Sequence, residues 1–259
     1  MMLRESTPIV VDIPEQKTIE IFGIHDLHYG NECFDTKKWL AFKRLVLSEE
    51  NRYVVFVGDL MENAVPNSKS DVFTQTATPR EQQEFVEEMF YEFKDRTLAI
   101  VDGNHEFNRS TKNCGLYPLY SAACVARVEE KYRSAFAVVD VGFGQVGNRM
   151  SRVSGFLIHN SKDLKNFGTV DAMEGIDFMW RGHDHEPIDH PRGHLVYDRQ
   201  RREVKIKSCE VLNSGSFLSF GGYGARAGFR PKSDKMFKLV LRSRGDRKKS
   251  VETHGFYLD

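Results

Sequence analysis

The segment TIEIFGIHDLH, residues 18–28, joins a short apolar run to residues that can bind a metal ion. Residues 18–25 are expected to form a β-strand, because a short apolar run bounded by polar residues is typical of a buried strand. Asp26 and His28 are two positions apart, so they would point to the same side of an extended chain. The segment therefore predicts a strand that presents metal ligands at its carboxyl end.

Apolar runs continue to alternate with segments of helical periodicity as far as Trp180, which predicts an α/β fold. A helix is expected over residues 36–48. Another is expected over residues 79–95, with Thr78 as its cap and Glu81 in position for a capping box. Beyond Trp180 the apolar residues alternate with polar ones, so the C-terminal third is expected to be rich in strands. The other expected strands cover residues 53–57, 98–101, 135–141, 153–159, 176–180, 195–197 and 204–207.

Composition indicates an ordinary globular protein. The 259 residues include 37 Lys and Arg against 37 Asp and Glu, and 40% are hydrophobic. The sequence shows neither a leader pattern nor a run of apolar residues long enough to span a membrane, so we expect a cytoplasmic protein that does not enter a membrane. The four cysteines lack the spacing of a zinc site or of a disulfide framework, so we expect reduced thiols. The sequence does not indicate an oligomeric state.

Polar residues that can bind metal follow several other expected strands, where open α/β sheets place their ligands. Together with Asp26 and His28 they give seven candidates, too many for one tetrahedral site and suited to two ions that share a carboxylate. A pair of ions stabilises the attacking and leaving oxygens in phosphoester hydrolysis. Oxygen and imidazole ligands without thiolates favour Mn²⁺, with Fe, Zn²⁺, Mg²⁺ or Ni²⁺ as alternatives. The candidates are Asp26, His28, Asp59, Asn104, His159, His183 and His185.

In order along the chain, the blocks Asp-x-His, Gly-Asp, Gly-Asn-His-Glu, His and Gly-His-x-His occur between Asp26 and His185. In this respect the sequence resembles the calcineurin-like metallophosphoesterases, and in particular the small stand-alone enzymes of bacteria and phages, some of which are nuclease-like. The resemblance implies a four-layer α/β/β/α sandwich of two mixed sheets flanked by helices. It also implies a single domain over residues 1–259, with an N-terminal extension at 1–17 and a β-rich part at 186–259 that completes the second sheet.

The resemblance also implies a role for each residue of these blocks. Asp26, His28 and His185 would hold the first ion. Asn104, His159 and His183 would hold the second, and Asp59 would bridge the two. A hydroxide between the ions would attack phosphorus in line.

Other residues near the blocks are expected to act without binding metal. His105 would act on the substrate, either as general acid or by stabilising phosphate charge, and Glu106 would orient or polarise His105. His25 is expected to be a packed strand residue that points away from the site. Glu62 is either an acceptor for a ligand imidazole or an ordinary loop carboxylate. Arg109 is either a clamp for the substrate phosphate or an exposed structural arginine.

The glycine-rich stretch 213–231 carries two further candidates for substrate binding, Tyr223 and Arg226. This stretch could close over the site as a lid, or it could be a flexible connector between strands. The sequence does not distinguish these two interpretations.

The expected reaction is hydrolysis of a phosphodiester in nucleic acid (DNA or RNA) or in nucleotides. A phosphomonoesterase of small metabolites is the alternative enzyme, and a non-catalytic binding scaffold is the alternative of another class. Residues 1–180 carry 20 basic against 27 acidic residues, whereas residues 181–259 carry 17 against 10. The net charge of zero therefore does not exclude a polyanionic substrate, because the basic residues are concentrated in the last part of the chain. The basic runs at 199–202 and 242–249 could contact a phosphate backbone or simply be solvated.

Overall fold

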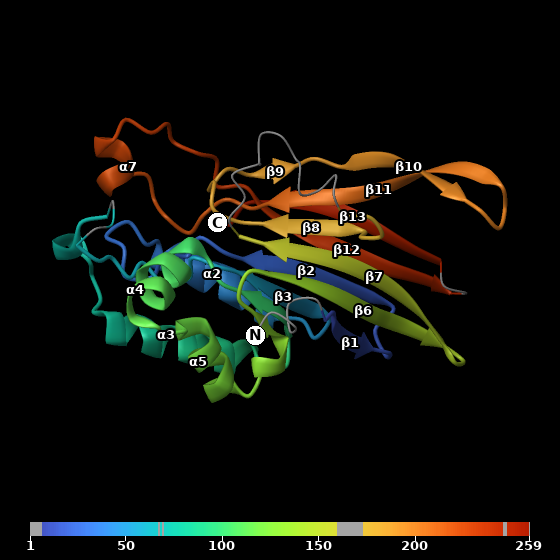
Figure 1. The fold of residues 1–259 in the computed structure, drawn as a ribbon, viewed down its shortest axis with the longest axis horizontal. Helices are drawn as coiled ribbons and strands as arrows, with labels where there is room; N and C mark the ends of the chain where they lie inside the picture. The colour runs from blue at the N-terminus through green and yellow to red at the C-terminus, as the bar shows by residue number, and fades with distance from the viewer. Residues whose placement is uncertain (1–6, 67, 69, 160–172, 246–247, 259) are drawn as a thin grey trace.

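The structure is a computed structural model that describes residues 7–66, 68, 70–159, 173–245 and 248–258. Two mixed β-sheets pack face to face and are flanked by helices (Figure 1), which confirms the expected fold class. Among the described residues, no helix combines the length and the apolar character that a membrane span requires.

The six-stranded sheet has four parallel strands at its centre and on one side. Its order is β13-β12-β2-β3-β4-β5, and β2 to β5 are parallel, whereas β12 runs antiparallel to β2 and to β13. The strands are β2 (Thr18–Ile24), β3 (Arg52–Val57), β4 (Thr97–Val101), β5 (Tyr132–Arg133), β12 (Met236–Gly245) and β13 (Lys248–Phe256).

The seven-stranded sheet has the order β1-β6-β7-β8-β11-β10, and β9 also pairs with β11. Strands β7, β8 and β11 are parallel to one another. The strands are β1 (Ile9–Ile13), β6 (Phe136–Val146), β7 (Arg149–Ile158), β8 (Phe178–Arg181), β9 (Ile188–Asp189), β10 (Arg192–Asp198) and β11 (Glu203–Asn213).

Three helices pack on the outer face of the six-stranded sheet. They are α2 (Thr36–Leu47), α3 (Pro79–Phe93) and α5 (Pro118–Ala126). Helix α3 begins with the expected capping box, in which Thr78 and Glu81 satisfy each other's backbone N–H groups. The shorter helical segments are η1 (Val72–Thr74), η2 (His105–Thr111), α4 (Lys112–Cys114), η3 (Glu129–Lys131) and α7 (Gly222–Arg226).

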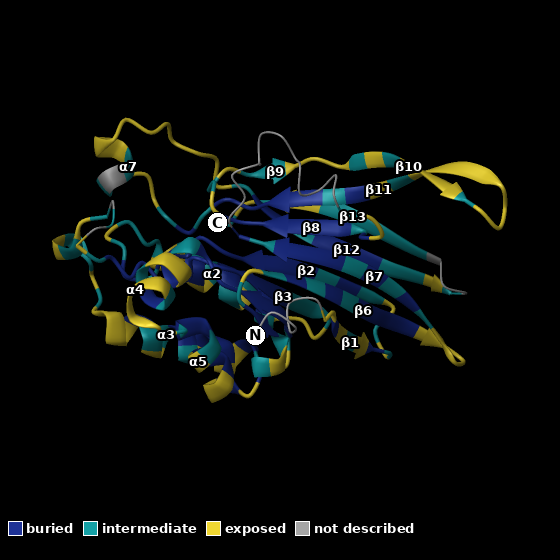
Figure 2. Cartoon of the chain, in the orientation of Figure 1, coloured by how far each residue is buried: buried dark blue, intermediate teal, exposed yellow. Residues whose placement is uncertain are grey.

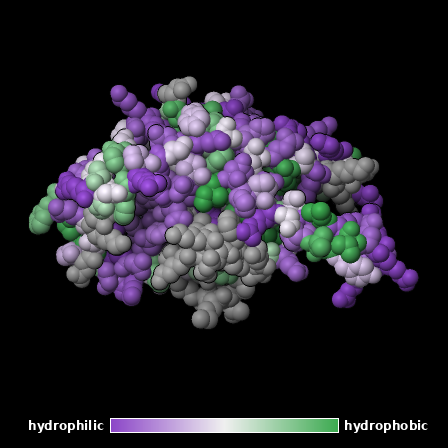
Figure 3. All heavy atoms as spheres, turned by 90° about the horizontal axis from the view of Figure 1, so that it is seen from above, coloured by the Kyte–Doolittle hydropathy of each residue, from purple (hydrophilic) through white to green (hydrophobic). Residues whose placement is uncertain are grey.

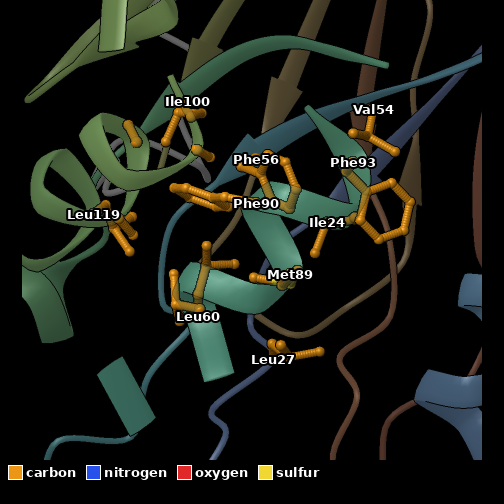
Figure 4. Close-up of a cluster of buried hydrophobic side chains, with 14 of the residues drawn as sticks. Ile24, Leu27, Val54, Phe56, Leu60, Met89, Phe90, Phe93, Ile100 and Leu119 are labelled. Carbon is orange, nitrogen blue, oxygen red and sulfur yellow. The ribbon is translucent and has the colours of Figure 1, made fainter. Parts of the chain in front are cut away.

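The central strands contribute side chains to two hydrophobic cores, because successive side chains of a strand point to opposite faces of the sheet. Val54 and Phe56 of β3 face the helices, where they pack with Phe90 and Phe93 of α3 (Figure 4). Val55 and Val57 belong instead to the core between the two sheets. These four side chains are fully buried, so the strand is held on both faces (Figure 2).

The two ends of the chain contribute to the sheets in ways that the sequence patterns did not indicate. Residues 1–17 were expected to be an extension, but β1 lies within them and pairs in parallel with β6. Residues 186–259 were expected to complete one sheet, whereas β9 to β11 join the seven-stranded sheet and β12 and β13 join the other.

Candidate metal centre

The candidate ligands follow strands whose carboxyl ends meet at one end of the molecule. The arrowheads of β2, β8 and β11 point toward the end where α4 and α7 lie (Figure 1). Strands β2, β3 and β4 are parallel, and so are β7 and β8. The loops that follow these strands therefore lie at the same edge of each sheet. The six-stranded sheet contributes Asp26, His28, Asp59 and Asn104, and the seven-stranded sheet contributes His159, His183 and His185.

Two glycines allow the loops after β3 and β4 to touch through their backbones. A Cβ atom on Gly58, whose φ is +74°, would lie 2.3 Å from the backbone nitrogen of Gly103. A Cβ atom on Gly103 would lie 2.2 Å from the backbone nitrogen of Asp59. Any larger residue would separate the loops. The glycines of the Gly-Asp and Gly-Asn blocks therefore bring Asp59 close to Asn104.

The first ligand group consists of Asp26, His28 and His185, whose ligand atoms lie close enough to share one ion. The Nε2 atoms of His28 and His185 are 3.1 Å apart, and His185 Nε2 lies 3.3 Å from Asp26 Oδ1. These atoms come from both sheets and converge on one point. The arrangement fits a divalent cation, because imidazole nitrogens and a carboxylate oxygen are its usual ligands.

The second ligand group consists of Asp59, His159 and His183. Asp59 Oδ2 lies 3.1 Å from His159 Nε2 and 3.9 Å from His28 Nε2, so it stands between the two groups. Asn104 Oδ1 is buried and has no hydrogen-bond partner among the described residues. A buried amide oxygen normally has a partner, so this atom also fits a cation ligand.

The two aspartates are ionised despite their burial. Burial opposes ionisation of Asp59, but the imidazoles of His105 and His159 outweigh it and hold the pKa of its carboxyl below its usual range. Burial likewise opposes ionisation of Asp26, and His185 and His25 lower the pKa of that carboxyl well below its usual range. The site therefore presents two negative charges to a cation.

Five of the seven candidate ligands have left-handed backbones, which residues other than glycine rarely adopt. The φ values are 49° for Asp26, 50° for His28, 51° for Asp59, 88° for His183 and 54° for His185. Each such residue costs about 1–3 kcal/mol of stability, and strain of this kind is often found at functional sites. The fold therefore holds these side chains in place at the expense of stability.

Additional contacts orient the candidate ligands through their remaining polar atoms. His28 Nδ1 lies 3.3 Å from the carboxylate of Glu62, and His159 Nδ1 lies 2.6 Å from the carbonyl oxygen of Val57. Glu62 is buried, which favours the imidazole acceptor over the ordinary loop carboxylate. Such partners fix the ring orientation of metal-binding histidines.

His25 has a different position from the one expected. It is buried, but its Nδ1 lies 2.8 Å from Asp26 Oδ2 and its Nε2 accepts a hydrogen bond from the backbone of Ser214. Because Nε2 is the acceptor, Nδ1 carries the proton and donates it to Asp26. His25 therefore orients a candidate ligand. The alternation of strand residues did not indicate this, because the chain leaves the extended conformation at Asp26.

His105 lies at the start of η2, a π-helix, and its ring borders both ligand groups. Arg109, four residues later, donates from Nη2 to His105 Nε2 at 2.9 Å. His105 Nδ1 lies 2.9 Å from the carbonyl oxygen of Glu62, so it must be the protonated nitrogen. His105 Nε2 is also 3.7 Å from Asp59 Oδ2. Burial, reinforced by His28 and Arg109, lowers the pKa of His105 to about 4 although Asp59 opposes it.

Arg109 is part of the site and is largely buried. Its guanidinium lies 3.1 Å from Glu62 Oε1, and it also donates to the carbonyl oxygen of Glu62. Glu62 therefore connects Arg109 to His28. Arg109 is therefore not an exposed arginine, and its role as a substrate clamp stays a prediction.

Glu106 does not have the contacts expected for a residue that polarises His105. Its Oε1 accepts the backbone N–H groups of Leu60 and Met61, and its Oε2 accepts those of Asp59 and Gly103. The Glu106 carboxylate thus binds the loops after β3 and β4 together. The sequence could not reveal this role, since all four donors are backbone groups.

The stretch 213–231 begins at the site and continues along the loop that follows His28. The backbone nitrogen of Phe217 donates to the carbonyl oxygen of Asp26, and that of Ser219 donates to Cys33. Arg226 Nη2 lies 3.6 Å from Glu32 Oε1, so the structure brings this candidate to the neighbouring loop. The backbone of Tyr223 belongs to α7, and its side chain lies outside the described part of the structure.

The described residues of the two basic runs lie at the opposite end of the sheets. Arg242 pairs with Thr18, the first residue of β2, whereas Asp26 follows the end of that strand. Residues 199–202 precede β11, whose Leu212 pairs with Trp180 near the site. Glu203 and Leu212 are nine residues apart along β11, and an extended strand of this length spans about 30 Å. These runs therefore do not border the candidate metal centre.

Comparison with known proteins supplies a family for this site. A sequence model described as calcineurin-like phosphoesterase matches residues 21–206, a range that contains all seven candidate ligands. The chain belongs to the calcineurin-like phosphoesterase family. Membership and the two His/Asp groups together support a metal-dependent phosphoesterase, since the family uses dinuclear divalent metal centres.

Solved structures with a similar fold include the calcineurin-like phosphoesterase YfkN from Bacillus subtilis. It is 14% identical, with a TM-score of 0.43, and the match covers 93% of this chain and 90% of that one. Vps29 from Chaetomium thermophilum is 14% identical (TM-score 0.35), and a hypothetical protein from Thermus thermophilus is 8% identical (TM-score 0.41); each match covers 93% of this chain and 100% of the other. A search of curated proteins gave no match.

Replacing Glu106 by Gln should lower both the stability and the metal affinity of this phosphoesterase. Whichever oxygen becomes the amide nitrogen, two buried N–H groups lose their acceptor, at a cost of about 1–3 kcal/mol each. Urea unfolding and Mn²⁺ titration calorimetry measure the two effects. If Glu106 acted only on His105, E106Q would bind Mn²⁺ as the wild type does and lose only turnover.

Replacing His183 by Gly should give a more stable protein than replacing it by Ala. Both changes remove the imidazole, but only Gly adopts the left-handed backbone without strain. The free energy of unfolding of H183G, measured with urea in the presence of EDTA, should therefore be about 1 kcal/mol higher than that of H183A. The matched control is Asp184, which has no positive φ and should show the usual preference for Ala over Gly. Equal stabilities of H183G and H183A would contradict the assignment of strain.

Proposed function

We propose that this protein is a phosphodiesterase that uses two divalent metal ions, with Mn²⁺ as the preferred metal. The observation that carries the proposal is the position of Asp59, whose carboxylate lies within 4 Å of imidazole nitrogens from both ligand groups. Asp26, His28 and His185 would hold one ion, and Asn104, His159 and His183 would hold the other. Asp59 would contact both.

The bound ions would supply a nucleophilic water of lowered pKa and would offset charge on the phosphate oxygens. The side chains of the protein have three further tasks. Glu106 and His25 hold the Asp59 loop and the Asp26 carboxylate in place. Glu62 orients His28 and Arg109. His105 and Arg109 face the substrate.

We assign His105 to stabilising phosphate charge through Arg109, which it holds, rather than to donating a proton. Its Nε2 accepts from Arg109 and its Nδ1 donates to the Glu62 carbonyl, which is the pattern of a neutral ring. The guanidinium of Arg109, held beside this ring, would supply the positive charge for a phosphate oxygen. We therefore propose charge stabilisation, and not general acid catalysis, as the role of His105.

The balance of charges favours a phosphodiester over a phosphomonoester. Asp26 and Asp59 would offset half of the charge of two divalent ions. The Glu106 carboxylate is bonded to four backbone N–H groups, and Arg109 is paired with Glu62. A deprotonated water would leave a single positive charge, which matches the monoanion of a diester better than the dianion of a monoester. Nucleic acid or a nucleotide would supply such a diester. A phosphomonoesterase remains the alternative enzyme.

A non-catalytic scaffold is the alternative of another class. The position of Asn104 Oδ1 argues against it, because a buried oxygen without a partner has no structural purpose in the described part of the chain. Six of the seven candidate ligands and His105 also fall in overlapping groups that could hold an ion, although they follow five different strands of two sheets.

With Mn²⁺, the protein should hydrolyse bis-p-nitrophenyl phosphate faster than p-nitrophenyl phosphate. Asp59→Asn should reduce turnover on the order of a thousandfold, because removing one shared charge costs several kcal/mol of transition-state stabilisation. Release of p-nitrophenol, measured with the metal content of both proteins, provides the test. Preference for the monoester would refute the diester assignment, and a metal-free, inactive wild type would refute the enzyme itself.

His105→Gln should lower kcat by a similar factor for diesters with good and poor leaving groups. A group that stabilises phosphate charge acts equally on both, whereas a proton donor matters most for the poor leaving group. The measurement compares bis-p-nitrophenyl phosphate with methyl phenyl phosphate for the wild type and H105Q. A much larger loss with the phenyl ester would assign His105 as the general acid.

A further inference from the structure

Strands β10 and β11 form an arm, residues 192–209, that projects beyond the rest of the seven-stranded sheet (Figure 1). The arm is a two-stranded antiparallel ribbon in which Arg192 pairs with Cys209 and Asp198 pairs with Glu203. Most of it is exposed (Figure 2). Within the described residues, β10 is an edge strand, so one row of its backbone groups faces outward. A two-stranded ribbon of this kind has little stability of its own.

One face of the arm is apolar although it is exposed. Leu195 pairs with Ile206 and Tyr197 pairs with Val204, and the exposed fractions of Leu195 and Ile206 are 74% and 75%. Since alternate residues share a face, Ile206 lies on the same side of β11 as Leu212, which is buried between the two sheets. The apolar face thus lies on the same side of β11 as the inter-sheet core, with Ser208 and Glu210 between the two. Figure 3 shows apolar side chains gathered at this end of the molecule.

The sequence of β10, RGHLVYD, is complementary to itself in an antiparallel pair. A two-fold axis through Leu195 places this residue opposite its counterpart in a second copy. Gly193 then lies opposite Tyr197, and Arg192 lies opposite Asp198, once on each side of the axis. Opposite charges and an aromatic ring over a glycine both favour cross-strand pairing. In this register Leu195 and Tyr197 of both copies lie on one face.

We propose that the protein forms a symmetric dimer through β10, with two arms joined in one continuous sheet across the two-fold axis. The pairing satisfies the backbone groups of the edge strand and brings Leu195 and Tyr197 of the two copies side by side on one face. The candidate metal centre lies at the other end of the sheets, so the dimer leaves both sites open. The proposal does not depend on the proposed function.

Charge reversal tests this register in the full-length protein by sedimentation equilibrium over a concentration series. R192D should raise the dimer dissociation constant about tenfold or more, since it places like charges opposite one another twice. D198R should do the same, and it also removes the acceptor of the turn N–H groups of Gln200 and Arg201. The double variant R192D/D198R should restore dimerisation. Val10→Lys is the matched control, because Val10 is 60% exposed on β1, the other edge strand of the same sheet. A monomeric wild type, or a dimer that R192D and D198R leave unchanged, would overturn the proposal.

A covalent trap keeps the test independent of any damage to the arm. Leu195→Cys, made with Cys114→Ser and Cys124→Ser to remove the exposed thiols, should give a disulfide-linked dimer on mild oxidation. Val10→Cys in the same background should remain monomeric on a non-reducing gel. Failure of the Leu195→Cys protein to cross-link while Val10→Cys does so would place the interface on the opposite edge of the sheet.

Discussion

The candidate metal centre depends on the Glu106 carboxylate, which accepts four backbone N–H groups from the loops after β3 and β4. Gly58 and Gly103 let these loops touch, and the carboxylate then satisfies the amides that the close approach would leave buried. Asp59 is held by this arrangement through its own N–H group. The position of the shared carboxylate is therefore decided by a residue that need not touch an ion.

Strained ligand loops are tolerated because the strands beneath them are held on both faces. The core between the sheets and the core under the helices bury every side chain in the second half of β3. Left-handed backbones at Asp26, Asp59 and His183 cost stability locally, and this burial offsets the cost. Rigid strands with strained loops at their carboxyl ends give a site whose geometry exists before an ion arrives.

The sequence predicted the parts of the fold and site that depend on local pattern. The apolar runs gave β2, β3 and β4 within one residue of their observed ends, and the motifs identified residues that the structure does bring together. Contacts between distant segments were not predictable. Strand β1 pairs with β6, about 130 residues away, and His25 and Glu106 act through hydrogen bonds to backbone groups that no motif records. The assignment of metal ligands remains a proposal.

The first ligand group joins residues from both sheets, and His28 and His185 are 157 positions apart in the chain. During synthesis from the N-terminus, the segment that supplies Asp26 and His28 is complete long before β8 and its following loop exist. The ion cannot be held by this group until the second sheet has formed against the first. If the first ligand group binds an ion as proposed, metal would enter only after both sheets have formed, so a loaded centre would indicate a completed fold.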